Sequence, residues 1–73
     1  MNFKKRAVEA LTTKAKADAA AAAASLSIML DNPAGIGDHS TSDLHNNLND
    51  SLQALADAEG RLETLQRNPS LFD

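Results

Sequence analysis

The sequence contains no cysteine, tryptophan or tyrosine. Without cysteine, neither a disulfide bond nor a cysteine-ligated zinc ion can stabilise the fold. The aromatic content is 3% and consists of Phe3 and Phe72, whereas alanine and leucine dominate the apolar residues, which favours helix over sheet. A chain of 73 residues buries a small fraction of its surface when it folds alone. We therefore expect a single domain, residues 1–73, that gains stability by association.

Positive charge is also scarce, because seven Lys and Arg residues face ten Asp and Glu residues, a net charge of -3. Nucleic acid is therefore not the expected partner, since phosphate binding normally needs an excess of basic residues. The charges are divided unevenly: residues 1–31 hold five basic and three acidic residues, and residues 32–73 hold two basic and seven acidic residues. If the two halves fold back on each other, their charges are complementary.

Long hydrophobic runs are absent as well. The most apolar segment, residues 19–30, is too short and too rich in alanine to span a bilayer. The first six residues resemble the charged start of a signal peptide, but no adequate hydrophobic run follows them. We expect no secretion by a signal peptide and no membrane partner.

Good helix formers fill residues 4–31, with no glycine or proline among them and six consecutive alanines at positions 19–24. A flexible low-complexity spacer is the alternative, but charged and apolar residues keep helical spacing on both sides of the alanines. We predict a helix whose apolar stripe contains small residues that let a neighbouring helix approach closely. This stripe consists of Val8, Leu11, Ala15, Ala19, Ala22, Leu26, Met29 and Leu30.

Asn32 and Pro33 should end this helix, because proline cannot donate a backbone hydrogen bond and restricts the residue before it. Residues 32–41 are therefore predicted to be a loop, in which Gly35 and Gly37 permit unusual backbone angles. Ser40 or Ser42 could cap the helix that follows.

The second predicted helix, residues 42–67, carries a heptad pattern. One series is Leu48, Leu55 and Leu62, and the offset series is Leu44, Ser51, Ala58 and Leu65, with Leu52 widening the stripe. Gly60 inside this helix costs about 1 kcal/mol relative to alanine, so we expect a close contact or a slight bend there. The tail, residues 68–73, either caps the bundle through Leu71 and Phe72 or is frayed.

We predict an all-α fold: an antiparallel two-helix hairpin that associates into a four-helix bundle or a higher helical oligomer. In this hairpin Leu30 lies beside Leu44, and the basic start of the first helix meets Glu59 and Glu63. The residues expected to form the core and the oligomer contacts are Val8, Leu11, Leu26, Leu30, Leu44, Leu48, Leu52, Leu55, Leu62 and Leu65.

The loop is the only segment with an unusual sequence, and it is the candidate site for a ligand or partner. Two glycines before a helix start can direct backbone amides at an anion, although the Lys-Ser/Thr ending of a phosphate-binding loop is missing. A turn that needs glycine, with an apolar plug over the bundle end, is the other interpretation. The candidate residues are Gly35, Ile36, Gly37, Asp38 and His39.

We expect no metal, no cofactor and no enzymatic activity. His39 and His45 lie near Asp38 and Asp43, but their spacing matches no known zinc or calcium pattern. The serines of the loop have no spacing that identifies a catalytic base or oxyanion donors. Asp18 lies beside the alanine stripe, where a solvated position is favoured and Lys14 is the partner it would need if buried.

The segment Asn-Pro-Ala-Gly-Ile-Gly-Asp-His, at residues 32–39, precedes a leucine-rich helix that contains Ala-Asp-Ala-Glu-Gly-Arg-Leu at residues 56–62. This combination resembles short helical proteins of T4-like tailed phages of cyanobacteria and other marine bacteria. The similarity covers residues 30–67, and the first helix matches only in character. The resemblance implies a viral origin, hence the cytoplasm of a bacterial host cell or the virion, and it assigns no activity.

Two functional hypotheses follow. The first is a non-enzymatic assembly or interaction protein, a homo-oligomer that joins a virion or binds a host protein, with an acidic surface that includes Asp43, Asp50 and Asp57. The alternative is an oligomeric sponge that captures a nucleotide signal at the glycine-containing loop and thereby acts against host defence.

Overall fold

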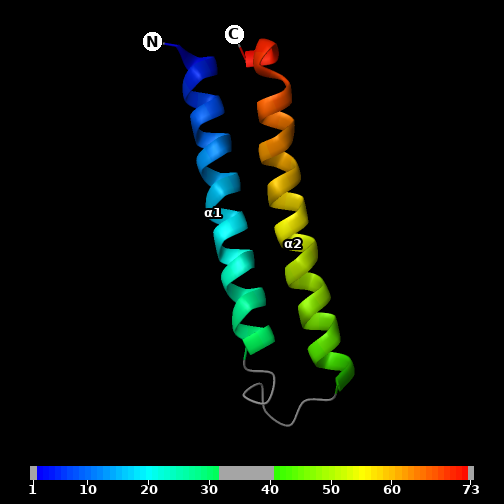
Figure 1. Ribbon diagram of the computed structural model, residues 1–73. Helices are drawn as coiled ribbons and strands as arrows, with labels where there is room; N and C mark the ends of the chain where they lie inside the picture. The colour runs from blue at the N-terminus through cyan, green and yellow to red at the C-terminus, as the bar shows by residue number, and fades with distance from the viewer. Residues whose placement is uncertain (1, 32–40, 73) are drawn as a thin grey trace.

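The computed structural model describes residues 2–31 and 41–72 of the chain. Helix α1 spans Phe3–Asp31, helix α2 spans Thr41–Arg67, and a short 3-10 helix, η2, spans Pro69–Phe72. The described elements are all helical, and α1 packs against α2 (Figure 1). The expected all-α helical hairpin is therefore confirmed, with helix bounds within one residue of the predicted ones.

Polar side chains mark the helix ends. The side-chain oxygen of Asn2 accepts a hydrogen bond from the Lys5 amide at 3.2 Å, and the Asn2 carbonyl accepts one from the Arg6 amide at 3.2 Å. Asn2 therefore caps α1, as asparagine commonly does. At the far end of α2, the Asn68 side-chain amide donates to the Thr64 carbonyl at 2.8 Å, and Pro69 then prevents the helix from continuing.

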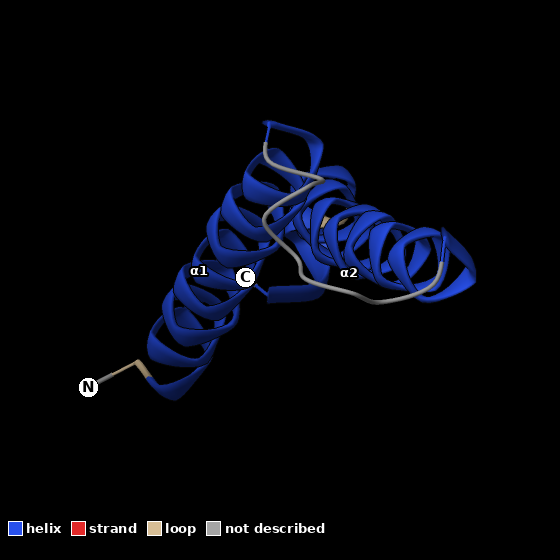
Figure 2. Cartoon of the chain, turned by 90° about the horizontal axis from the view of Figure 1, so that it is seen from below, coloured by secondary structure: helices blue, strands red, loops and turns tan. Residues whose placement is uncertain are grey.

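The helices lie side by side and antiparallel, so both chain termini are at the same end (Figure 1). Seen along the hairpin, the two helix axes are inclined to each other (Figure 2). The molecule measures 53 × 18 × 14 Å, with a radius of gyration of 16.4 Å. A compact chain of this length would have a radius of gyration of about 11 Å, so the hairpin is an elongated unit.

The fully buried part of the hairpin is very small. Among the residues that the structure describes, it consists of Ala15, Ala22 and Ala58, which are 1%, 8% and 0% exposed. Alanine at these positions allows the backbones to approach closely, because no long side chain separates them. No large side chain is fully buried among the residues that the structure describes. The two helices are therefore in close contact, but they bury little apolar surface between them.

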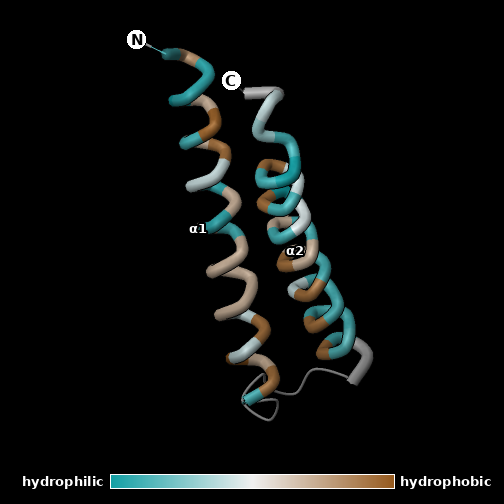
Figure 3. Tube along the Cα trace, turned by 45° about the horizontal axis from the view of Figure 1, so that its top comes forward, coloured by the Kyte–Doolittle hydropathy of each residue, from teal (hydrophilic) through white to brown (hydrophobic). Residues whose placement is uncertain are grey.

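The two helices differ in how their apolar residues are distributed. In α2 the hydrophobic positions lie on the side toward α1 and the hydrophilic positions on the far side (Figure 3). Helix α1 is much less amphipathic than α2, because alanines occur all around it. A helix that is apolar on more than one side usually has more than one packing partner. Neither helix combines the length and the apolar character that crossing a membrane requires.

Candidate functional site

The loop residues predicted to bind a ligand or partner lie outside the described part of the chain. These are Gly35, Ile36, Gly37, Asp38 and His39. The surfaces that the structure does describe belong to the two helices, and the candidate functional surface is built from them.

The ten predicted core and oligomer residues divide into two groups. Seven are half-buried between the helices: Val8, Leu26, Leu44, Leu48, Leu55, Leu62 and Leu65. The other three are largely exposed in the single chain, with Leu11 at 53%, Leu30 at 61% and Leu52 at 54%. The half-buried leucines hold the hairpin together, and the exposed ones are available to another molecule.

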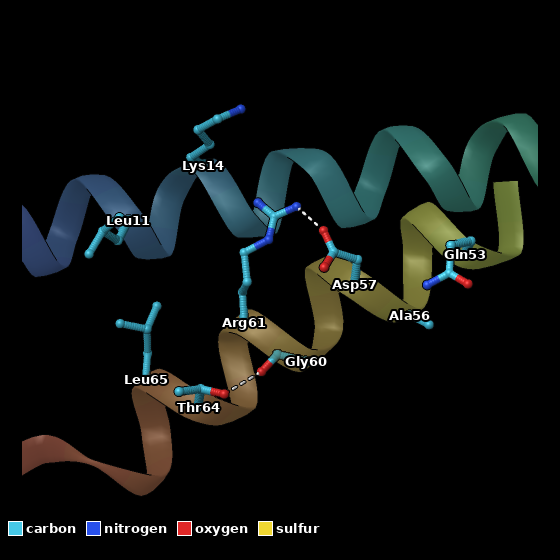
Figure 4. A pocket seen from close by; sticks show the side chains of 9 residues that line it. All are labelled: Leu11, Lys14, Gln53, Ala56, Asp57, Gly60, Arg61, Thr64 and Leu65. Atoms are coloured by element: carbon cyan, nitrogen blue, oxygen red, sulfur yellow. Dashed lines mark hydrogen bonds and ion pairs between the residues drawn. The ribbon is translucent and has the colours of Figure 1, made fainter. Parts of the chain in front are cut away.

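Charged side chains join the middle of α1 to the C-terminal part of α2. The Asp18 carboxylate of α1 accepts a hydrogen bond from the Lys14 ammonium at 3.2 Å and one from the Arg61 guanidinium of α2 at 3.1 Å. The same guanidinium also donates to Asp57, one turn earlier in α2 (Figure 4). In the described residues, this is the ion-paired cluster that bridges the helices. Glu63, expected near the basic start of α1, forms an ion pair with Arg67 of its own helix.

This cluster perturbs two ionisable groups. The hydrogen bond from Lys14, followed by the one from Arg61, lowers the pKa of Asp18 below its ordinary value of 3.8. The hydrogen bonds to Asp57 and then to Asp18 raise the pKa of Arg61. Both shifts favour the charged forms of Asp18 and Arg61, so this pair is ionised near neutral pH. The cluster therefore acts as a structural link between the two helices.

A groove with a volume of about 630 Å³ opens beside this cluster. Leu11 and Leu65 close one end of it, and their side chains point toward each other from the two helices (Figure 4). Gly60 lies in its wall, and a Cβ atom added there would meet no other atom within 4 Å. The close contact expected at Gly60 is therefore not found within the described chain. The remaining lining residues are Lys14, Gln53, Ala56, Asp57, Arg61 and Thr64.

Two further grooves continue along the same face of the hairpin. The first, of about 410 Å³, lies between Ala21 of α1 and Asp50 of α2, and the second, of about 440 Å³, lies between Ile28 and Asp50. Ala22 of α1 and Ser51 of α2 line the first of these together. Shallow, open grooves between helices are shaped to accept an elongated object such as another helix.

Comparison of the chain with protein-family models, with curated proteins and with solved structures finds no match. Within residues 2–31 and 41–72, no three His, Cys, Asp or Glu side chains gather in a way that could hold a metal ion. The function is therefore inferred from the surfaces of the hairpin.

Sequence reasoning found the partner Lys14 for Asp18 but missed Arg61, because the contact depends on how α2 lies against α1. It also missed the outward face of α1, where Phe3 and Ile28 are 80% and 64% exposed. The spacing of the alanines in α1 contained the information for this outward face. Only some of these alanines had been assigned, and those to the stripe that faces α2.

Proposed function

We propose that this chain is a non-enzymatic assembly or interaction protein that acts as a homo-oligomer of helical hairpins. The observation that carries the proposal is that, among the described residues, only three alanines are buried, whereas five large apolar side chains are exposed. Small domains without disulfides or metals need another source of stability, and association of copies supplies it.

The size of the exposed surface supports association. The accessible surface is 5489 Å² for a mass of 7.7 kDa. A compact monomer of that mass would expose about 4,300 Å², so the hairpin exposes about 1,200 Å² more. A standard interface buries about 800 Å² on each partner. The excess surface is therefore sufficient for one such interface.

The apolar residues on that surface are large. Phe3, Leu11, Ile28, Leu30 and Leu52 are each more than half exposed. Removing such side chains from water on association is favourable. Asp50 and Asp57, two of the acidic residues expected to bind a partner, are exposed and line the grooves between the helices.

The biological setting of the proposal is viral, and it rests on the resemblance of residues 30–67 to short proteins of tailed phages. In that setting the oligomer is either a component of the virion or an effector that binds a host protein. Mass spectrometry of purified phage particles separates these two roles, because a virion component is found at a fixed copy number and an effector is missing from the particles.

Light scattering coupled to size-exclusion chromatography tests the proposal at its base. At micromolar concentration we expect a mass that is an integral multiple of 7.7 kDa, at least twice that value. Circular dichroism of the same fraction checks that the chain is helical. A fully helical species with the mass of one chain, across the whole concentration range, would overturn the proposal.

A further inference from the structure

The outward face of α1 carries an unbroken heptad stripe. Its positions follow the alternating spacing of four and three residues that places side chains on one face of a helix. All are exposed except Ala7, which is half-buried, and Lys14 is the single charged member. We name this set the outer stripe; it consists of Phe3, Ala7, Ala10, Lys14, Ala17, Ala21, Ala24 and Ile28.

The outer stripe is distinct from the face that packs on α2. At 3.6 residues per turn, its centre lies about 120° around α1 from the buried Ala15 and Ala22. A third helix can therefore contact α1 without displacing α2. The equivalent outward positions of α2 offer no such surface, because they are mostly polar: Asn46, Asn49, Gln53, Ala56, Gly60, Glu63 and Arg67.

The stripe is symmetric about its own midpoint. When it is laid antiparallel on a second copy of itself, Phe3 meets Ile28, Ala7 meets Ala24, and Ala10 meets Ala21 of the other copy. Lys14 then meets Ala17. The two bulky residues at the ends, which are 80% and 64% exposed, contact each other, and the alanines between them let the helices approach closely. A surface that matches itself after a twofold rotation is what a symmetric dimer requires.

From this self-complementarity we infer that the partner of the outer stripe is the outer stripe of a second copy, packed antiparallel. The inference rests on the proposed function and specifies its interface. The pair would contain four helices, two from each copy, with the α1 helices in contact at the centre. The contact runs about 38 Å along each helix, from Phe3 to Ile28.

The grooves on the hairpin face support this arrangement. Each groove includes one stripe residue, namely Lys14, Ala21 or Ile28, spaced seven apart. The stripe thus forms one wall of a hollow that runs along the hairpin, beside which the second copy would lie.

Lys14 is the one charged residue in the stripe, and the structure shows how it can be accommodated. Its ammonium bonds to Asp18, which lies at the edge of the stripe, and its methylene stem is left to cover apolar surface. A long basic side chain with its charge held at the rim is compatible with an alanine on the opposite helix.

Cysteine cross-linking tests the arrangement directly, because the chain has no cysteine of its own. The variants are Ala10→Cys and Ala21→Cys, with Asn49→Cys as the control, because Asn49 is exposed on α2 and lines none of the three grooves. In the antiparallel pair two Ala10 positions are about 16 Å apart, which is too far for a disulfide bond. Ala10 of one copy, however, lies opposite Ala21 of the other.

We expect mild oxidation of an equal mixture, with one variant isotope-labelled, to give a disulfide dimer that contains one chain of each kind. Each variant alone, and the Asn49→Cys control, should stay largely uncross-linked. Efficient cross-linking of Ala10→Cys with itself would indicate parallel helices and overturn the inference. An oligomer by light scattering that gives no mixed disulfide would overturn it and leave the proposed function standing, whereas a monomer would overturn both.

A charge exchange tests the same interface without a cross-linking reaction. Ala10→Glu and Ala21→Lys each place a charge in the interface and should raise the dissociation constant at least about tenfold. Both residues are exposed in the single chain, so its helicity, followed by circular dichroism, should be kept. Combining the two on one chain should restore association, because the new carboxylate of each copy would face the new ammonium of the other, twice per pair. A double variant that associates no better than the single variants would refute the antiparallel arrangement.

Discussion

Asp18 and Arg61 are 43 positions apart in the sequence, and their side chains form an ion pair at 3.1 Å between α1 and α2. Because Lys14 and Asp57 bind the same two groups, each charge is held from its own helix as well as from the opposite one. The ion pair thus links one position of α2 to one position of α1.

A double-mutant cycle on Asp18 and Arg61 measures the energetic coupling between their side chains. Asp18→Asn and Arg61→Gln should each lower the thermal midpoint by a few degrees at most, because exposed ion pairs contribute little. The effect of the double variant should be smaller than the sum of the single effects, since the second change removes a group that has already lost its partner. Chemical or thermal unfolding at low and high salt provides the measurement, and the coupling should shrink at high salt.

The matched control for this cycle is the pair Glu63 and Arg67, which lies within α2 and bridges nothing. Its cycle should give a coupling typical of helix neighbours and should leave the packing of α1 unaffected. Strict additivity of Asp18→Asn and Arg61→Gln would show that the interhelix contact has no energetic role.

The stability of the hairpin should depend on pH through Asp18. Its pKa is lowered in the folded chain relative to its ordinary value of 3.8. The stabilisation is therefore fully present above that value and is lost as the pH falls through the lower, folded pKa. Urea unfolding at a series of acidic pH values should show that the free energy of unfolding of the parent chain declines as the pH falls. The decline should be smaller for Asp18→Asn. Parallel declines for the two proteins would contradict this assignment.

Ala58, which is enclosed between the two helices, should not be replaceable by a larger residue without loss of stability. Ala58 is 0% exposed, so Ala58→Leu must separate the backbones, and we expect it to reduce the free energy of unfolding by about 1–3 kcal/mol. Ala56→Leu, two residues away on the exposed side, should change it by less than about 0.5 kcal/mol. Denaturant unfolding of both variants tests the contrast, and equal stabilities would mean that Ala58 is not enclosed.

Gly60 should be replaceable by alanine with a gain in stability. The glycine lies inside α2, and a Cβ atom there meets nothing within 4 Å. Gly60→Ala should therefore raise the free energy of unfolding by about 1 kcal/mol, the usual difference in helix propensity. The same variant should leave the oligomer mass unchanged if copies associate through α1. A loss of association would instead place Gly60 in the contact between copies.

The architecture of the hairpin could be predicted from the sequence because its signals are local and strong. The heptad leucines of α2, Leu48, Leu55 and Leu62, have a period that only a helix satisfies. Asn32-Pro33 and Asn68-Pro69 stop helices for reasons of backbone chemistry, and the structure ends α1 and α2 next to them. An antiparallel arrangement then follows from the short connection between the helices.

The functional surface was harder to predict, because alanine carries a weak signal. In α1, alanines occur on several faces of the helix. The pattern alone therefore does not distinguish the series that faces α2, which includes Ala15 and Ala22, from the outward series, which includes Ala10 and Ala17. Only the structure shows which face α2 covers. The contact between Asp18 and Arg61 was missed for a related reason, since it depends on the relative position of two helices along their length.

The two termini lie together at one end of the hairpin (Figure 1). In the proposed antiparallel pair, the second copy would carry its own two termini to the opposite pole. A fluorescent label fused to either terminus would then sit far from its twin across the pair, and a protein domain attached there would be displayed in two copies facing away from each other. The pair would therefore serve as a double-ended spacer.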